Sequence, residues 1–72
     1  MMKVELKEIV DQLTMVCDLP NDHKVAAIID EDNNNEILGW EIVKVYENNT
    51  ILPINSIIYG SIKELIKDVG LR

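Results

Sequence analysis

The side chains best suited to chemistry in this sequence are carboxylates and amides that crowd the segment 30–41, DEDNNNEILGWE. Asp30, Asp32, Asn34 and Glu41 stand at its first, third, fifth and twelfth positions. Hard divalent cations such as Ca²⁺ take several oxygen ligands at once, and this spacing offers side-chain oxygens from one short loop. A weak calcium-binding loop at 30–41 is therefore one prediction.

This spacing resembles the twelve-residue calcium loop of EF-hand proteins, where side chains ligate from positions 1, 3, 5 and 12 and a backbone carbonyl from position 7. The resemblance covers a dozen residues and departs from the motif at two of them. Asn35 replaces the glycine of the sharp turn, and Leu38 offers no side-chain oxygen at position 9. The β-branched residues before Asp30 also predict no incoming helix. The sequence favours a solvated hairpin turn over a metal site.

Two apolar runs flank this acidic turn and predict the strands of a β-hairpin. Residues 24–30 and 36–47 are rich in β-branched and aromatic side chains, which fit a pleated sheet better than a helix. The Asp and Asn residues of 32–35 tolerate left-handed backbone and hydrogen-bond within turns. In the second run the apolar alternation changes phase between Ile42 and Val43, which predicts a bulge or a strand buried on both faces.

The segments on either side of the hairpin predict helices. Residues 3–17 carry apolar side chains at helical spacing, with charged residues on the opposite side. After a short third strand over 50–52, the C-terminal segment predicts a second helix that starts between 54 and 61. Ser61 with Glu64 three residues later fits a capping box, and Gly70 fits a C-terminal cap.

These elements predict a single α+β domain over residues 1–72. Its architecture is a three-stranded antiparallel sheet with two helices on one face, in the order α-β-β-β-α. A small, strongly bent barrel is the alternative if 54–59 is a strand. The face of the sheet away from the helices is expected to be open and apolar, with four side chains there: Ala26, Ile28, Val43 and Val45.

Charge and composition argue against several functional classes. The 72 residues carry a net charge of −6, which opposes direct binding to nucleic acid or to anionic membranes. The single Cys17 and the absence of an N-terminal signal-peptide pattern predict a cytoplasmic protein without disulfides. Cys17 is expected to be buried and His23, the only histidine, to lie at the surface. Neither has an evident catalytic neighbour, so we expect no enzyme activity, no cofactor and no small-molecule substrate.

The remaining class is a protein–protein interaction module, with a second copy of itself as the expected partner. An alternative is an acidic regulator or inhibitor, by analogy with small acidic proteins of phages and mobile elements. Such a regulator would dock on a basic nucleic-acid-binding protein, because opposite charges steer association. The expected partner-binding residues are the carboxylates of the turn and two aromatic anchors: Asp30, Glu31, Asp32, Glu36, Trp40 and Tyr46. Trp40 also fits the core, since the chain has few large side chains to fill it.

Overall fold

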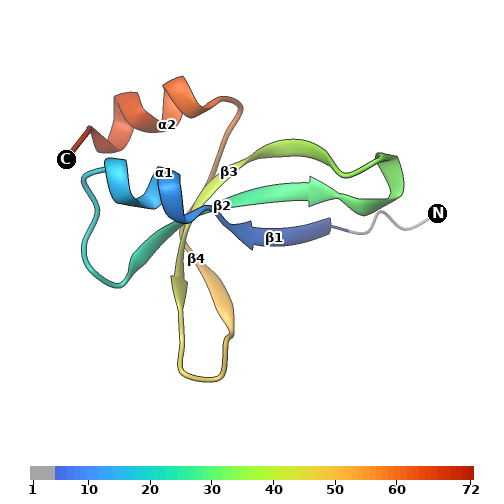
Figure 1. Ribbon diagram of the computed structural model, residues 1–72, viewed down its shortest axis with the longest axis horizontal. Helices are drawn as coiled ribbons and strands as arrows, with labels where there is room; N and C mark the ends of the chain where they lie inside the picture. The colour runs from blue at the N-terminus through green and yellow to red at the C-terminus, as the bar shows by residue number, and fades with distance from the viewer. Residues whose placement is uncertain (1–4) are drawn as a thin grey trace.

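A four-stranded antiparallel sheet and two short helices make up the fold, which is of the α+β class (Figure 1). The computed structural model describes residues 5–72. The strands lie in the order β1-β2-β3-β4, so each pairs with its neighbour in sequence. The elements in chain order are β1 (Glu5–Ile9), α1 (Asp11–Val16), β2 (His23–Asp30), a 3-10 turn (Glu31–Asn33), β3 (Glu36–Val45), β4 (Ile51–Tyr59) and α2 (Ile62–Val69).

The prediction of a helix over 3–17 is wrong for its first half, which forms strand β1. Residues 3 and 4 of that prediction lie outside the described part of the chain. β1 pairs with β2 in antiparallel register, from Glu5 opposite Asp30 to Ile9 opposite Ala26. Strand pairing outweighs the helical spacing of the apolar residues, because helix propensity is a weak preference that tertiary contacts override. The sheet therefore has four strands rather than the predicted three.

The short helix α1 is held in place by a threonine. Thr14 Oγ1 accepts a hydrogen bond of 2.9 Å from the Val25 N–H of β2 and donates one of 2.8 Å to the Val10 carbonyl. The Asp18 N–H, just after the helix, donates to the Gly70 carbonyl over 2.9 Å. A helix of six residues is unstable alone, so these bonds to β2 and to the C-terminal segment are what stabilise it.

The segment 54–59 is strand, which was the alternative reading of the sequence. β4 passes through Pro53, a residue that edge strands accept because their outer N–H groups need no partner. Opposite Ile42 of β3, β4 carries the extra residues 54–57 as a bulge, in which Ser56 adopts a φ of 59°. The predicted barrel does not form, because β1 and β4 remain the two edges of an open sheet.

Helix α2 begins and ends at the predicted caps. Ser61 Oγ accepts a hydrogen bond of 3.2 Å from the Glu64 N–H. The Glu64 carboxylate reaches back to the Gly60 N–H over 3.4 Å, one residue earlier than in a standard capping box. At the other end Gly70 takes a φ of 82° and donates its N–H to the Ile66 carbonyl over 2.7 Å. Ser61 and Gly70 are therefore the caps of the helix, as predicted, whereas the return bond of the predicted capping box goes to Gly60 instead of Ser61.

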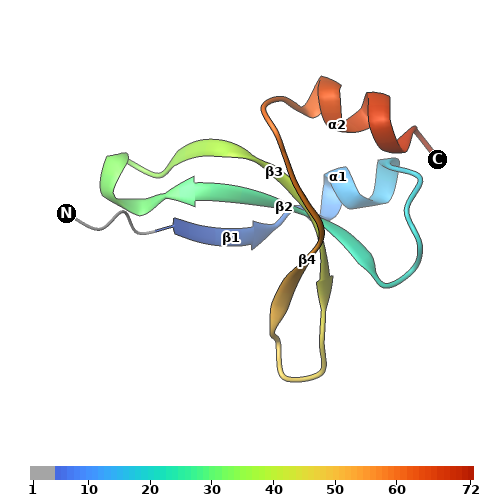
Figure 2. The ribbon, with the colours of Figure 1, turned by 180° about the vertical axis from the view of Figure 1, so that it is seen from behind.

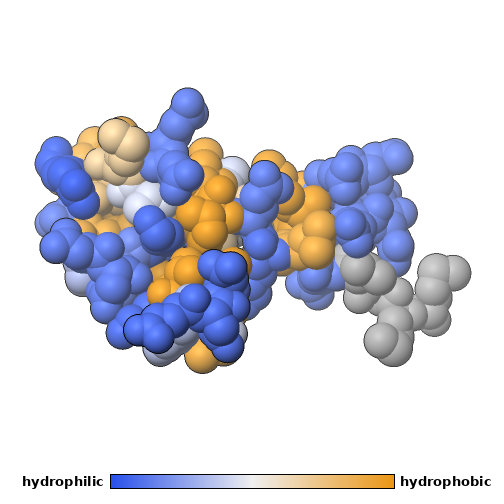
Figure 3. Space-filling model, turned by 60° about the horizontal axis from the view of Figure 1, so that its bottom comes forward, coloured by the Kyte–Doolittle hydropathy of each residue, from blue (hydrophilic) through white to orange (hydrophobic). Residues whose placement is uncertain are grey.

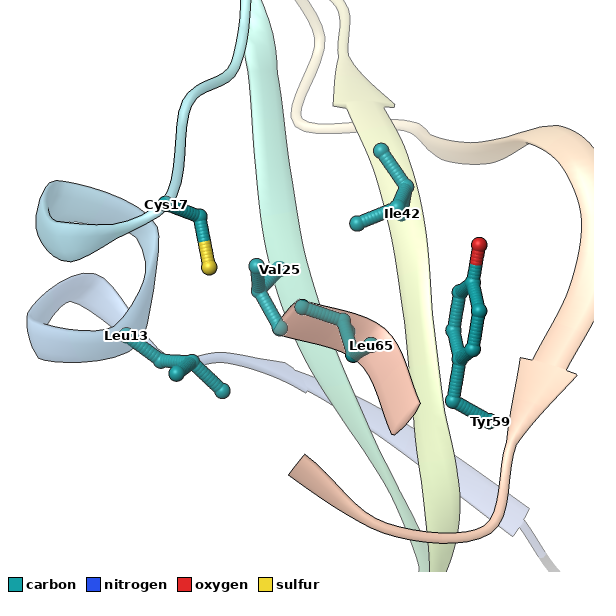
Figure 4. Close-up of a cluster of buried hydrophobic side chains, with 6 residues drawn as sticks. All are labelled: Leu13, Cys17, Val25, Ile42, Tyr59 and Leu65. Carbon is teal, nitrogen blue, oxygen red and sulfur yellow. The ribbon is translucent and has the colours of Figure 1, made fainter. Parts of the chain in front are cut away.

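The main core lies between the helices and one face of the sheet (Figure 4). Its buried side chains come from five elements: Leu13, Cys17, Val25, Ile42, Tyr59 and Leu65. Figure 4 shows Leu13 of α1 and Cys17, the residue just after α1, directed toward Val25 of β2. The prediction that Cys17 is buried is confirmed, and this burial raises the pKa of its thiol by desolvation.

The prediction of an open apolar face opposite the helices is wrong for three of its four residues. Ala26, Ile28 and Val43 are all at most 3% exposed, and only Val45 is half-buried. On this face Lys7 lies opposite Ile28 and Glu41 opposite Ala26, and the ion pair between them crosses this part of the sheet. The hairpin of β3 and β4 also turns sharply away from the plane of β1 and β2 (Figures 1 and 2). With Ile42 buried on the helix side and Val43 on this side, β3 is buried on both faces, as one reading of the sequence predicted.

Candidate interaction surfaces

The acidic residues gather at one end of the sheet. The strand register places Glu5 opposite Asp30, and Asp30 opposite Glu36, so three carboxylates form a row across β1, β2 and β3. Like charges directly opposite one another in a sheet cost stability. Glu31 and Asp32 follow in the exposed turn beyond this row. The structure therefore brings together the predicted acidic contact residues.

Asp30 differs from its neighbours because it is buried, with 3% of its surface exposed. One carboxylate oxygen accepts a hydrogen bond of 3.1 Å from the Asp32 N–H and so starts the 3-10 turn. Asn34 and Asn35 then take left-handed backbone, with φ of 56° and 58°. Asp30 thus shapes the turn, and the exposed carboxylates are Glu31, Asp32 and Glu36.

The four residues of the predicted calcium loop are not gathered around one point. Asp30, Asp32 and Asn34 lie at the turn, whereas Glu41 lies five residues beyond Glu36 in β3, roughly 17 Å along an extended strand. Glu41 is 4% exposed, and its Oε1 lies 2.7 Å from Nζ of Lys7. That oxygen has no well-formed hydrogen bond within the described residues, so the ion pair with Lys7 is what offsets the cost of burying its charge.

The two predicted aromatic anchors are in different environments and far from each other. Trp40 is half-buried and packs against the main core, opposite Ala27 of β2. Tyr46 is exposed just beyond β3, where Nζ of Lys44 lies 5.3 Å from the centre of its ring. Ten residues separate Tyr46 from Glu36, up to roughly 30 Å of strand. Tyr46 and the acidic turn are therefore at opposite ends of β3 and form no single site.

His23 and Tyr59 are the remaining polar groups placed by the fold. His23 is half-buried at the start of β2, with its Nε2 3.7 Å from the Asp22 carboxylate, which Lys44 also approaches to 3.1 Å. Tyr59 of β4 is buried, and its hydroxyl donates a hydrogen bond of 2.7 Å to Asp68 of α2. This hydrogen bond raises the pKa of Tyr59, with a further contribution from desolvation.

The Tyr59–Asp68 bond should make stability depend on pH in the alkaline range. A phenol whose pKa is raised by folding contributes stability below its unfolded pKa of about 10, and this contribution is lost as pH rises through the folded value. We expect Tyr59→Phe to lower the free energy of unfolding by about 1 kcal/mol at neutral pH and to reduce the loss of stability above pH ~10. Urea unfolding between neutral and alkaline pH measures both effects.

Tyr46→Phe is the matched control, because it removes the same phenol hydroxyl from an exposed position, and the effect of Tyr59→Phe is measured against it. The buried Cys17 thiol also has a raised pKa and so also contributes to the loss of stability at alkaline pH. Both variants retain Cys17 and therefore retain this contribution. A Tyr59→Phe protein whose stability falls with pH as steeply as that of the wild type would contradict the assignment.

The exposed aliphatic side chains of β4 are a feature that the sequence patterns do not predict. Leu52, Ile54, Ile57 and Ile58 are 41–58% exposed, and Ile62 at the start of α2 is 39% exposed. We call these five residues the β4 strip; Leu52 pairs with Lys44 and Ile58 with Glu41, so these two point to opposite faces and the strip wraps the edge of the sheet. Nine consecutive residues of the strand, ILPINSIIY, carry no charge. That uncharged run is the available signal, but Pro53 and the apolar spacing after it predict a short strand followed by a helix.

A second apolar group lies at the acidic end, on the opposite face from the carboxylate row. The register aligns Leu6, Ile29 and Ile37 across β1, β2 and β3, because a bulge at Leu38 shifts the pairing. Leu6 and Ile37 are 45% and 50% exposed. This row is narrower than the β4 strip and is bordered by charged residues in each strand.

Pockets and metal clusters are not found within residues 5–72. No pocket is present there, and no group of three or more His, Cys, Asp or Glu side chains is arranged to hold a metal ion. None of the described helices is long and apolar enough to cross a membrane. Comparison with protein-family models, curated proteins and solved structures finds no match to this chain.

Proposed function

We propose that this protein is a non-enzymatic interaction domain that associates with a second copy of itself. The observation that supports this proposal is the concentration of exposed aliphatic side chains on β4 and at the start of α2. Eleven large hydrophobic residues are exposed among the described residues, and five of them form the β4 strip. A chain of this size buries only about 60% of its unfolded surface, and oligomerisation is a common way to bury more.

Sedimentation velocity from low micromolar to near-millimolar concentration tests the proposal. We expect the mass to rise from the 8.2 kDa of the monomer toward twice that value as concentration increases. A mass that stays at the monomer value throughout would remove self-association as the function.

A second candidate function is that of an acidic regulator that binds a basic nucleic-acid-binding protein. The row of Glu5, Asp30 and Glu36 supports it, because it concentrates negative charge at one end of the sheet. The exposed carboxylates of the adjoining turn extend this negative surface away from the sheet. Attraction between such a surface and a basic partner would mainly increase the association rate.

Neutralising the exposed turn tests this candidate. The variant Glu31→Gln/Asp32→Asn/Glu36→Gln keeps Asp30, which shapes the turn. The control variant Glu8→Gln/Asp11→Asn/Asp18→Asn removes the same amount of charge from other exposed positions. The regulator hypothesis expects a basic partner captured from cell lysate by the wild type and the control to be lost by the turn variant. Equal capture by all three proteins would contradict it.

A further inference from the structure

We propose that two copies associate through their β4 strips, in an antiparallel two-fold arrangement with Glu47 of each copy beside Lys63 of the other. This inference rests on the proposed self-association and specifies its surface. The strip is the least charged part of a protein whose net charge is −6. In Figure 3 apolar side chains reach the surface in the middle of the view, with hydrophilic side chains on both sides.

The two edges of the sheet are protected against further strand pairing in different ways. β1 carries Glu5, Lys7 and Glu8, and charge on an edge strand discourages pairing with another chain. β4 instead carries Pro53, which has no N–H, and the bulge 54–57. Within that bulge the Ile57 N–H is already bonded to the Asn55 side chain over 3.1 Å. A contact at β4 is therefore made by side chains rather than by extending the sheet.

Charge identifies a second copy as the occupant of this strip. Two copies that each carry −6 repel one another, and the repulsion is weakest where an uncharged surface meets itself. A basic partner would find its complement on the acidic turn instead. A two-fold contact is also self-limiting, because the same patch of both copies is used up in one closed dimer.

The ends of the strip determine the antiparallel direction. Glu47, in the turn before β4, and Lys63, in the first turn of α2, are exposed, and neither makes an ion pair with another described residue. They lie equally far along the chain from Asn55, at the centre of the strip. Figure 1 shows the turn and α2 at opposite ends of β4. A two-fold axis near Asn55 therefore pairs Glu47 with Lys63 twice, whereas a parallel arrangement would bring like charges together.

The length of the strip suits an interface of ordinary size. Nine extended residues span up to roughly 30 Å, less what the bulge removes. A standard interface buries about 800 Å² on each partner. The accessible surface of this protein is 5184 Å², so such an interface would occupy a strip that runs along one side of the molecule.

The first test removes apolar surface from two places. Ile54→Gln/Ile57→Gln changes exposed residues of the strip, and Leu6→Gln/Ile37→Gln changes equally exposed residues at the acidic end. Dimer dissociation constants come from sedimentation equilibrium, and circular dichroism melts verify that each variant is folded. We expect at least a tenfold weaker dimer for the strip variant and an unchanged dimer for the control. A dimer that persists in the strip variant would overturn this inference and leave self-association standing, whereas a monomeric wild type would overturn both.

The second test reverses the charges at the two ends. Glu47→Lys and Lys63→Glu alone should each weaken the dimer severalfold, and the double variant should restore it. If only the repulsion between two negatively charged copies mattered, the result would differ. Glu47→Lys would then strengthen the dimer, because it makes the protein less negative. Strengthening by Glu47→Lys, or a double variant no better than the singles, would overturn the antiparallel arrangement.

Discussion

Replacing Gly39 by alanine is expected to destabilise the protein by about 2–3 kcal/mol, because β4 crosses this glycine too closely to admit a side chain. An added Cβ would lie 2.6 Å from Cγ2 of Ile58 and 3.0 Å from the carbonyl oxygen of Tyr59. The Ile58 side chain can rotate away, but the Tyr59 backbone is paired with Trp40 of β3 and cannot move without breaking the ladder. Urea unfolding of the variant measures the loss.

Gly60→Ala is the matched control, since its nearest neighbour is Glu64 Oε2 at 3.7 Å, an ordinary contact. It should change stability by less than about 1 kcal/mol. The double variant Gly39→Ala/Ile58→Ala removes the contact with the Ile58 side chain and keeps the contact with the Tyr59 carbonyl. It should therefore recover only part of the lost stability. Equal stability of Gly39→Ala and Gly60→Ala would contradict the close approach of β4 to β3.

Breaking the ion pair between Lys7 and Glu41 is the second change with a large expected effect. Glu41 is buried on the face away from the helices, and Lys7 reaches it across β2 from the edge strand. Lys7→Met leaves the carboxylate buried without its partner, which costs about 3–5 kcal/mol in fully buried pairs. The Lys7 side chain is 33% exposed, so water reaches the site and we expect the lower end, about 2–3 kcal/mol.

The double variant Lys7→Met/Glu41→Leu tests this explanation. Replacing both charges by apolar side chains removes the desolvation cost together with the attraction, so most of the stability should return. Lys44→Met is the control for a solvated pair, since its partner Asp22 is exposed, and only a small change is expected. A Lys7→Met protein as stable as the wild type would show that Glu41 is solvated in a way this structure does not explain.

Gly39 and the Lys7–Glu41 ion pair both belong to the face of the sheet away from the helices. At Gly39 the chain has no side chain, and Ile58 of β4 packs into the space. Along the same face Ala26 and Val43 are fully buried, and Ala26 lies directly opposite Glu41. This second buried layer explains why a face predicted to be open for a partner is closed within one copy. It also explains why the exposed apolar surface lies on β4 instead.

Local sequence patterns determined several features without help from the rest of the fold. The Asp and Asn residues of 32–35 specify the turn because their short polar side chains stabilise left-handed backbone. Ser61 and Gly70 delimit α2 because a hydroxyl and a missing Cβ satisfy the ends of a helix. The burial of Cys17 followed from its position one helical turn after Leu13 in the apolar stripe, although Val16 of the same stripe is exposed.

The strands β1 and β4 were decided only by tertiary structure. Glu5–Ile9 has apolar residues that fit either a helix or an edge strand, and pairing with β2 selects the strand. Ile51–Tyr59 crosses a proline and a bulge that break any simple alternation, so its pairing with β3 is invisible in the local pattern. Which face is buried also depends on the bend of the sheet, a property of all four strands together. Sequence periods report local geometry, whereas the exposure of a surface depends on residues far apart in the chain.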